Sequence, residues 1–296
     1  MFRLAHISDL HLGPIPKVRF HELVSKRITG YVNWQQHRKL FHQKIILDRV
    51  MSQIEAQNCD HLAITGDLVN LATKAEIIEA TNWLAIHCPP QTTSLVPGNH
   101  DAYVPGAFRT AMKAWEPWIA SDTPIVDQTF PYMQIRGPLA IIGLSTSNAT
   151  MPFRATGRFS KRQAEHAKKL LIEAKEKGLF RVILIHHPPY HKATITMKRM
   201  AGIDHFQNMI EDCGAELVLH GHTHLNTRFD VEYNGRTTPI IGIASASQAP
   251  GDKKPVAGFN IFEIDGEQGA WNCNHKRMAL DPTADQAQII EQSNWS

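Results

Sequence analysis

The sequence predicts an α/β fold, and two observations support this prediction. First, short apolar runs recur along the chain and end in polar residues, which is typical of strands buried on both faces. Second, segments with helical periodicity lie between these runs, and alternation of strands with helices is characteristic of α/β domains. The runs are Leu4–Ser8, Leu62–Thr65, Ser94–Val96, Leu139–Leu144, Val182–Ile185 and Leu217–Leu219.

Three helices are predicted from apolar periodicity and from capping residues. The segment 40–57 carries apolar residues at the spacing of one helix face. The patterns Thr73-x-x-Glu76 and Ser160-x-x-Gln163 are capping boxes, in which a hydroxyl and a side chain three residues later satisfy free backbone N–H groups. Each pattern therefore predicts the start of a helix.

The last third of the chain predicts a different kind of structure. Between residues 228 and 265 the pattern favours strands and turns, and we expect them to form a second, more antiparallel sheet. We expect one domain over residues 1–280, which includes an insert at 17–44, followed by a polar tail at 281–296 that forms a loose helix. The strands expected in this region are Phe229–Tyr233, Ile240–Ala244 and Phe259–Ile264.

Composition excludes several classes of protein. A hydrophobic fraction of 43% and a net charge of +3 argue against disorder, and no apolar run is long enough for a membrane-spanning helix. Arg3, His6 and Asp9 interrupt the N-terminal apolar stretch, so we expect no signal peptide and a cytoplasmic protein. The four cysteines form no CxxC pair, which argues against a thiolate zinc site. The 17 histidines point instead to metal binding through imidazole.

Residues capable of binding metal follow five of the predicted strands. Ligands in open α/β sheets gather at the carboxyl ends of strands, so these residues are expected to lie together. Glycines in three of the motifs allow the backbone to approach a ligand closely. The motifs are Ser8-Asp9-Leu10-His11, Gly66-Asp67, Gly98-Asn99-His100-Asp101, His186-His187 and Gly221-His222-Thr223-His224.

Taken together and in this order, the motifs resemble the calcineurin-like metallophosphoesterases. The resemblance runs from residue 9 to residue 224. It implies a four-layer α/β/β/α sandwich with two mixed sheets, the metallo-dependent phosphatase-like fold. It also implies a binuclear metal centre, in which Asp67 bridges two divalent ions. One ion would be held by Asp9, His11, Asp67 and His224, and the other by Asp67, Asn99, His186 and His222, with His187 as the alternative to His186.

The resemblance also implies a hydrolytic mechanism. A metal-bridging hydroxide would attack phosphorus in line, and two ions would neutralise the attacking and leaving oxygens. His100 would protonate the leaving oxygen or stabilise charge there, with Asp101 as its orienting partner. The nitrogen and oxygen ligands suit Mn²⁺, Fe²⁺ or Zn²⁺ and do not choose among them.

Two segments outside the motifs are candidates for substrate binding. The insert 17–44 is basic and aromatic, and it is either an interfacial, lipid-facing element or a solvated helical hairpin with an ordinary packed face. As a lipid-facing element it would bring the protein to the inner face of a membrane as a peripheral protein. The loop 146–159 contains Asn148, Arg154 and Arg158, which are expected to contact substrate, although surface loops also carry such residues without function.

The leading hypothesis for function is a phosphodiesterase of the cyclic-nucleotide branch, with a small-molecule or lipid-linked phosphoester as substrate. One alternative is a UDP-2,3-diacylglucosamine pyrophosphatase of lipid A synthesis, because the segment 25–33 is similar to one in those enzymes. Another is a catalytically inert scaffold that binds proteins, as in the retromer coat. Nucleic acid is not expected as a partner, since the net charge is modest and the chain after His224 is too short for a sizeable capping domain.

Overall fold

Two six-stranded mixed sheets pack face to face in the computed structural model, which describes residues 1–122, 129–233, 235–281 and 286–296. The first sheet has the order β14-β13-β12-β1-β2-β3 and the second β10-β11-β9-β7-β5-β4. The first contains β1 (Phe2–Ile7), β2 (His61–Ile64), β3 (Thr93–Leu95), β12 (Gly258–Asp265), β13 (Asn272–Leu280) and β14 (Ala287–Trp295). The second contains β4 (Tyr132–Arg136), β5 (Leu139–Gly143), β7 (Phe180–Leu184), β9 (Leu217–His220), β10 (Thr227–Tyr233) and β11 (Arg236–Gly242).

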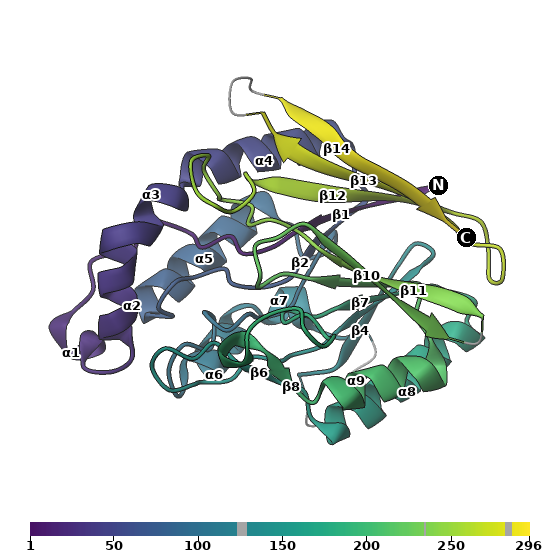
Figure 1. The fold of residues 1–296 in the computed structure, drawn as a ribbon, viewed down its shortest axis with the longest axis horizontal. Helices are drawn as coiled ribbons and strands as arrows, with labels where there is room; N and C mark the ends of the chain where they lie inside the picture. Colours follow the sequence, from purple (N-terminus) through teal and green to yellow (C-terminus); the bar gives the residue numbers. More distant parts are fainter. Residues whose placement is uncertain (123–128, 234, 282–285) are drawn as a thin grey trace.

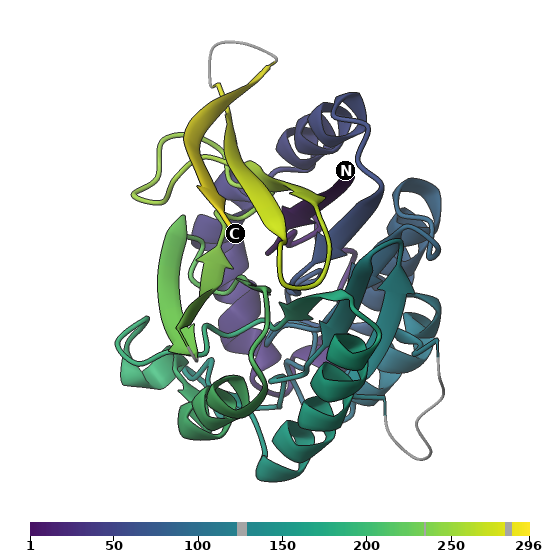
Figure 2. The ribbon, with the colours of Figure 1, turned by 90° about the vertical axis from the view of Figure 1, so that its right-hand side faces the viewer.

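Helices cover the outer faces of both sheets, so the molecule has the predicted four layers (Figures 1 and 2). The longer helices against the first sheet are α4 (Lys44–Ala56) and α5 (Lys74–His87), with α6 (Ala107–Ala114) and α7 (Glu116–Ile119) after β3. The second sheet is covered by α8 (Lys161–Glu176) and α9 (Ile203–Cys213). Short elements at the edge are β6 (Gly157–Arg158), β8 (Met200–Ala201) and the 3₁₀ helix η2 (Thr196–Lys198).

The alternation of side chains along the strands explains this layering. In β5, Leu139 and Ile141 join the large apolar cluster that includes the first sheet, whereas Ala140 and Ile142 join the cluster against α8 and α9. Successive side chains of a strand point to opposite faces, so a run without polar residues is buried on both sides. All six predicted runs form strands, namely β1, β2, β3, β5, β7 and β9.

Two expectations for the last third of the chain are wrong. The strands after residue 226 form no sheet of their own: β11 pairs in parallel with β9, and β12 pairs antiparallel with β1. The tail is not a loose helix, because Ala287–Trp295 forms β14 at the edge of the first sheet, where β13 offers free backbone groups. Residues 282–285 of the predicted tail lie outside the described residues.

The insert 17–44 is largely helical and lies at the end of the sandwich where β1 and β2 finish, on the left in Figure 1. Trp34 of the insert is buried with 4% of its surface exposed. Its ring occupies the space that a side chain at Gly13 would fill. The tryptophan therefore fixes the insert against the chain that leaves β1. The helices are α1 (Phe20–Leu23), α2 (Arg27–Asn33), the π-helix η1 (Trp34–Arg38) and α3 (Lys39–Phe41).

Among the helices of the described residues, none combines the length and the apolar character needed to cross a membrane.

Candidate metal centre

Backbone hydrogen bonds hold the loops after β1 and β2 side by side. The amides of Asp9 and His11 donate to the carbonyl oxygens of Gly66 and Asp67, each at 2.9 Å. The loop after β9 joins them, since the His222 amide donates to Asp9 Oδ2 at 2.9 Å. Loops from both sheets therefore meet at one point, as the positions of the motifs predict.

One group of predicted ligands surrounds Asp9. Asp9 Oδ1 lies 3.1 Å from His224 Nε2, and the Nε2 atoms of His11 and His224 lie 3.3 Å apart. Asp67 Oδ2 lies 3.9 Å from His11 Nε2. Two imidazole nitrogens each about 2.1 Å from one ion would be separated by a similar distance. The four side chains are therefore arranged as the ligands of a single ion would be.

A second group shares the same oxygen of Asp67. Asp67 Oδ2 lies 3.4 Å from His186 Nε2, which lies 3.3 Å from Asn99 Oδ1. His222 Nδ1 approaches Asn99 Oδ1 to 2.8 Å. His187 lies outside this group and contacts Thr146 Oγ1 at 2.7 Å. Asp67 thus stands between the two groups, and the structure brings together all seven predicted ligands with His186 rather than His187.

The burial and charge of these groups fit two cations. Asp9 Oδ1 is buried and accepts no hydrogen bond from the described residues. Although burial opposes ionisation, the His224 ring holds the pKa of Asp9 well below its ordinary value. Burial alone would lower the pKa of His186, but Asp67 raises it to about 9. Two ionised carboxylates buried together therefore require nearby positive charge, which metal ions would supply.

Hydrogen bonds on the outer side of the rings orient their lone pairs inward. His11 Nδ1 lies 3.3 Å from the carbonyl oxygen of Val69, and His186 Nδ1 lies 2.6 Å from that of Thr65. Each carbonyl oxygen accepts a hydrogen bond from Nδ1–H, so the neutral ring keeps its proton on Nδ1 and Nε2 is able to bind metal. This pattern of outer hydrogen bonds is common among metal-ligating histidines.

The backbone at the centre is unusual. Most L-residues avoid positive φ, and residues held there are concentrated at functional sites. Gly98 is required for a different reason, because a side chain at this position would collide with the Asp67 carboxylate. Five of the seven predicted ligands have positive φ: Asp9 (54°), His11 (43°), Asp67 (55°), His222 (69°) and His224 (55°).

Asp101 has a different role from the one predicted. His100 is oriented instead by the hydrogen bond that its Nδ1–H donates to the carbonyl oxygen of Asn70, 2.6 Å away. The Asp101 carboxylate instead accepts hydrogen bonds from four backbone amides, those of Asp67, Leu68, Val69 and Gly98. It folds the loop of the bridging aspartate, because the sharp turn at residues 98–101 directs its side chain away from the His100 ring and into that loop.

His100 is paired with Arg38, a residue of the insert. Arg38 Nη1 lies 3.0 Å from His100 Nε2. Burial, followed by the charge of Arg38, lowers the pKa of His100 to about 4. With its proton on Nδ1 toward Asn70, a neutral His100 accepts a hydrogen bond from Arg38. In this arrangement the donor that faces a leaving group is the guanidinium, whereas the sequence predicts His100 in that role.

A cleft of about 470 Å³ opens at the metal centre. Of the three predicted substrate contacts, Arg154 lines it. Arg158 lies outside the lining in β6, which pairs with β8, and Asn148 also lies outside it. The sequence analysis did not select Lys26, Arg38, Tyr103 or Lys198, which also line the cleft. The basic character of the insert was the available signal for the first two.

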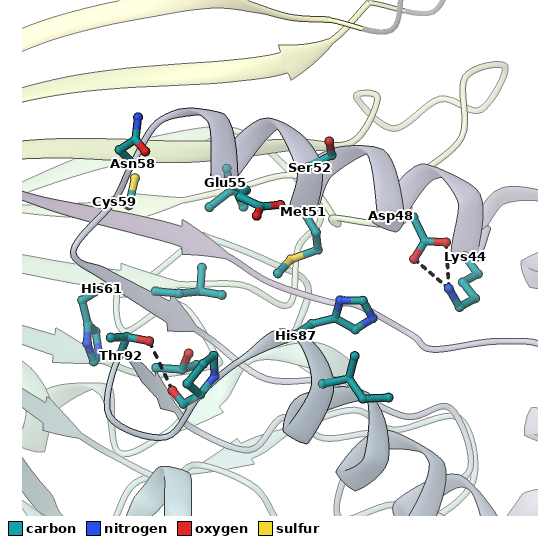
Figure 3. Close-up of a pocket in the computed structure, with 15 residues that line it drawn as sticks. Lys44, Asp48, Met51, Ser52, Glu55, Asn58, Cys59, His61, His87 and Thr92 are labelled. Atoms are coloured by element: carbon teal, nitrogen blue, oxygen red, sulfur yellow. Dashed lines mark hydrogen bonds and ion pairs between the residues drawn. The ribbon is translucent and has the colours of Figure 1, made fainter.

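A larger cleft of about 730 Å³ runs along α4, on the outer side of the first sheet (Figure 3). It is lined by α4, the end of α5 and the starts of β2 and β3. Lys44 pairs with Asp48 on one turn of α4, and His61 Nε2 contacts Ser94 Oγ at 2.7 Å. These two pairs lie apart, and no metal-binding group of the described residues is found in this cleft.

Comparison with known proteins identifies the fold. The family model of the calcineurin-like phosphoesterases matches residues 2–226. No curated protein matches the sequence significantly. Among solved structures, a dimetal phosphatase from Danio rerio is similar with a TM-score of 0.65 at 11% identity, covering 99% of this chain and 98% of that one. A purple acid phosphatase from yellow lupin seeds gives 0.59 at 12% identity, covering 99% of this chain and 53% of that one. GAP50, the anchor in the inner membrane complex of Plasmodium, gives 0.53 at 13% identity, covering 99% and 87%.

Proposed function

This chain belongs to the calcineurin-like phosphoesterase family, and from that premise we propose that it hydrolyses phosphoesters with two divalent ions at the centre described above. The observation that carries the proposal is the position of Asp67 Oδ2, 3.9 Å from a nitrogen of one ligand group and 3.4 Å from a nitrogen of the other. When bound, Mn²⁺, Fe²⁺ or Zn²⁺ ions would activate water and neutralise charge on the phosphoryl group.

Arg38 would bind the phosphoryl oxygens. Its guanidinium is half-buried beside the metal ligands, and burial lowers its pKa. Among the described residues, no carboxylate lies within ion-pair distance of it, and its neighbour is the neutral His100 ring. A cation in this position needs an anion, because a buried charge without a partner is costly. A phosphoryl group is the anion that a guanidinium fork matches best.

The rest of the cleft supports a substrate with more than one anionic group. Lys26, Arg154 and Lys198 line it together with Arg38. Lys26 Nζ donates to Thr150 Oγ1 at 2.7 Å and to the carbonyl oxygen of Arg154 at 2.8 Å, so it joins the insert to the loop 146–159. Burial lowers the pKa of Lys26 to about 8, which keeps it mostly charged at pH 7. We therefore favour pyrophosphates, which carry two anionic phosphoryl groups, with phosphodiesters of the cyclic-nucleotide type as one candidate.

The surface around the cleft favours a second candidate, a pyrophosphate linked to a lipid. Four apolar side chains recur every four residues from the start of α1 to α2, and each has at least 45% of its surface exposed: Phe20, Val24, Ile28 and Val32. Phe153, which lines the cleft, is 83% exposed. Apolar side chains among basic ones are typical of elements that contact anionic membrane surfaces. A UDP-2,3-diacylglucosamine pyrophosphatase-like activity and peripheral membrane contact through 17–44 would use both features.

A hydrolysis panel tests these proposals. Purified protein with added Mn²⁺ would be assayed on p-nitrophenyl phosphate, bis(p-nitrophenyl) phosphate, cyclic AMP and UDP-2,3-diacylglucosamine, and its metal content measured. We expect bound metal and faster turnover of diester or pyrophosphate than of monoester. Turnover of the lipid-linked substrate alone would favour the second candidate. Metal-free, inert protein would contradict both and favour a protein-binding scaffold.

A further inference from the structure

His42, the residue that follows α3, lies against the first group of metal ligands. Its ring centroid is 4.6 Å from that of His11 and 5.4 Å from that of His224, and the His11 and His224 centroids are 5.2 Å apart. A nitrogen of each ring lies within 4.8 Å of a nitrogen of the other two. We propose that His42 is an additional ligand of the ion held by Asp9, His11, Asp67 and His224.

The second ligand group provides an internal standard for this spacing. His186 and His222 are both predicted ligands of the other ion, and their ring centroids are 5.2 Å apart. The rings of His42, His11 and His224 are separated by 4.6, 5.2 and 5.4 Å, which agrees with this value. Spacing alone does not identify a ligand, because the His187 ring lies 5.0 Å from His186 and 4.3 Å from His222. The hydrogen bonds of His42 therefore carry the second part of the argument.

The hydrogen bonds of His42 resemble those of the other ligands. Its Nδ1 lies 3.0 Å from Ser247 Oγ and 3.4 Å from Ser245 Oγ. No described residue bonds to the other nitrogen, Nε2, although the side chain is buried with 7% of the residue exposed. The lone pair of Nε2 is therefore free to bind a metal ion. Coordination of metal would satisfy it, as it would for His11 and His186.

The backbone fixes the ring in this place. The Gln43 amide donates to the Ser247 carbonyl oxygen at 3.0 Å, and the Ala249 amide donates to that of Phe41 at 2.7 Å. The residues on both sides of His42 are thus joined to the segment that carries Ser247. Much of the insert is exposed, but its last turn is bonded to the rest of the domain at the point where the imidazole is needed.

An added imidazole would make the two metal sites unequal. One ion would have three nitrogen ligands and the carboxylates of Asp9 and Asp67, whereas the other would have two nitrogen ligands with Asp67 and Asn99. We expect the nitrogen-rich site to bind divalent transition metals more tightly, so the apoprotein should take up its two ions in separable steps.

Titration of the apoprotein with Co²⁺, followed by calorimetry and visible absorption, tests the proposal. His42→Ala should weaken one of the two sites by at least the roughly 10–100-fold that loss of an outer-shell partner costs, and it should change the cobalt spectrum. His61→Ala is the matched control, because His61 is also buried and bonded to a serine but lies in the larger cleft. It should keep both affinities. Unchanged affinities in His42→Ala would overturn the proposal.

A measurement on the unaltered protein avoids dependence on the folding of a variant. In the Co²⁺-loaded chain, each ligating histidine should give a strongly shifted exchangeable N–H proton resonance. We expect five, from His11, His42, His186, His222 and His224. The proposal rests on the proposed two-metal function, and the outcomes separate the two. Two bound ions with four such resonances would overturn the role of His42 alone, whereas failure to bind cobalt would overturn both.

Discussion

The sheet that contains β1, β2 and β3 has one cleft along α4 on its outer side and a smaller one at the carboxyl ends of its strands. The two clefts contain similar kinds of side chain. Both include histidines, carboxylates and lysines. In the larger cleft, Lys44 pairs with Asp48 (Figure 3), and His61 Nε2 contacts Ser94 Oγ. At the carboxyl ends of the strands, predicted metal ligands from separate loops converge, with Asp67 Oδ2 3.9 Å from His11 Nε2 and 3.4 Å from His186 Nε2. We therefore place the proposed function in the smaller cleft.

The difference between the clefts comes from the number of elements that meet. The larger cleft is lined mainly by successive turns of α4, together with the last residues of α5. The smaller cleft receives loops from both sheets, the insert 17–44 and the loop 146–159. Many converging loops allow charged groups to be held close together, because each loop is fixed by a different part of the core. The convergence of charged groups from separate loops therefore marks a candidate site better than the volume of the cavity does.

Replacing the bridging carboxylate should have the largest effect on metal content and activity, and it is the most direct test of the difference between the clefts. Asp67→Ala should remove both ions and lower kcat/KM by at least about a thousandfold, because the several kcal/mol that bound metal contributes to transition-state stabilisation are lost. Elemental analysis and steady-state kinetics would measure this. Asp48→Ala, in the other cleft, is the control and should keep metal and activity. Retained metal in Asp67→Ala would contradict the bridging role.

Removing the ring at residue 100 should leave the ions in place. His100→Ala is expected to lower turnover of alkyl esters by about 10²-fold, because the ring positions the Arg38 guanidinium that faces the leaving oxygen. Esters of p-nitrophenol, which leave easily, should be affected less. Comparison of the two substrate types at full metal occupancy would measure the effect. Full activity on an alkyl ester would show that His100 has no catalytic role.

Arg38 tests the comparison further, because it is the cation of the smaller cleft that has no carboxylate partner among the described residues. Arg38→Ala should lower kcat/KM by about 10²-fold, as loss of one donor to the transition state does, with unchanged metal content. Arg38→Lys should recover part of this loss, because lysine keeps the charge without the fork. The double variant with His100→Ala should lose less than the product of the single losses, since the two side chains are hydrogen-bonded. Independent effects would contradict their pairing.

Trp34 links the stability of the insert to the cleft. Trp34→Ala should lower the free energy of unfolding by about 3–5 kcal/mol, the usual result of truncating a buried aromatic residue. It should also reduce kcat/KM, since Arg38 lies at the other end of the same π-helix. Chemical denaturation and kinetics would measure both. If the variant is stable and as active as the natural chain, the tryptophan does not position the insert.

We expect the smallest effect on stability and activity from a substitution in the larger cleft. Lys44→Ala removes an ion pair whose side chains are 51% and 43% exposed. Exposed pairs of this kind contribute about 0.3–0.5 kcal/mol, so the melting temperature should change little and the activity not at all. Thermal denaturation and the hydrolysis assay would measure this. A marked loss of activity would mean that the larger cleft has a function after all.

The sequence predicted most of the metal centre because the ligands follow strands in order. Asp9, Asp67 and His186 could be selected because a strand end fixes where the next residue lies. Arg38 and His42 could not, because the placement of the insert depends on tertiary contacts such as that of Trp34 with Gly13. The role of Asp101 depends on the direction of one turn. Strand β14 was missed because its exposed face makes its pattern polar until it pairs with β13.

At the five predicted ligands with positive φ, selection for stability and selection for activity favour different residues. Glycine adopts this conformation without the cost of about 1–2 kcal/mol that other residues pay. Exchange of such a ligand for glycine would thus strengthen the metal-free fold while abolishing turnover. A directed-evolution library screened for heat resistance alone should accumulate glycine at these sites. Descendants of this chain that no longer need catalysis should drift in the same direction.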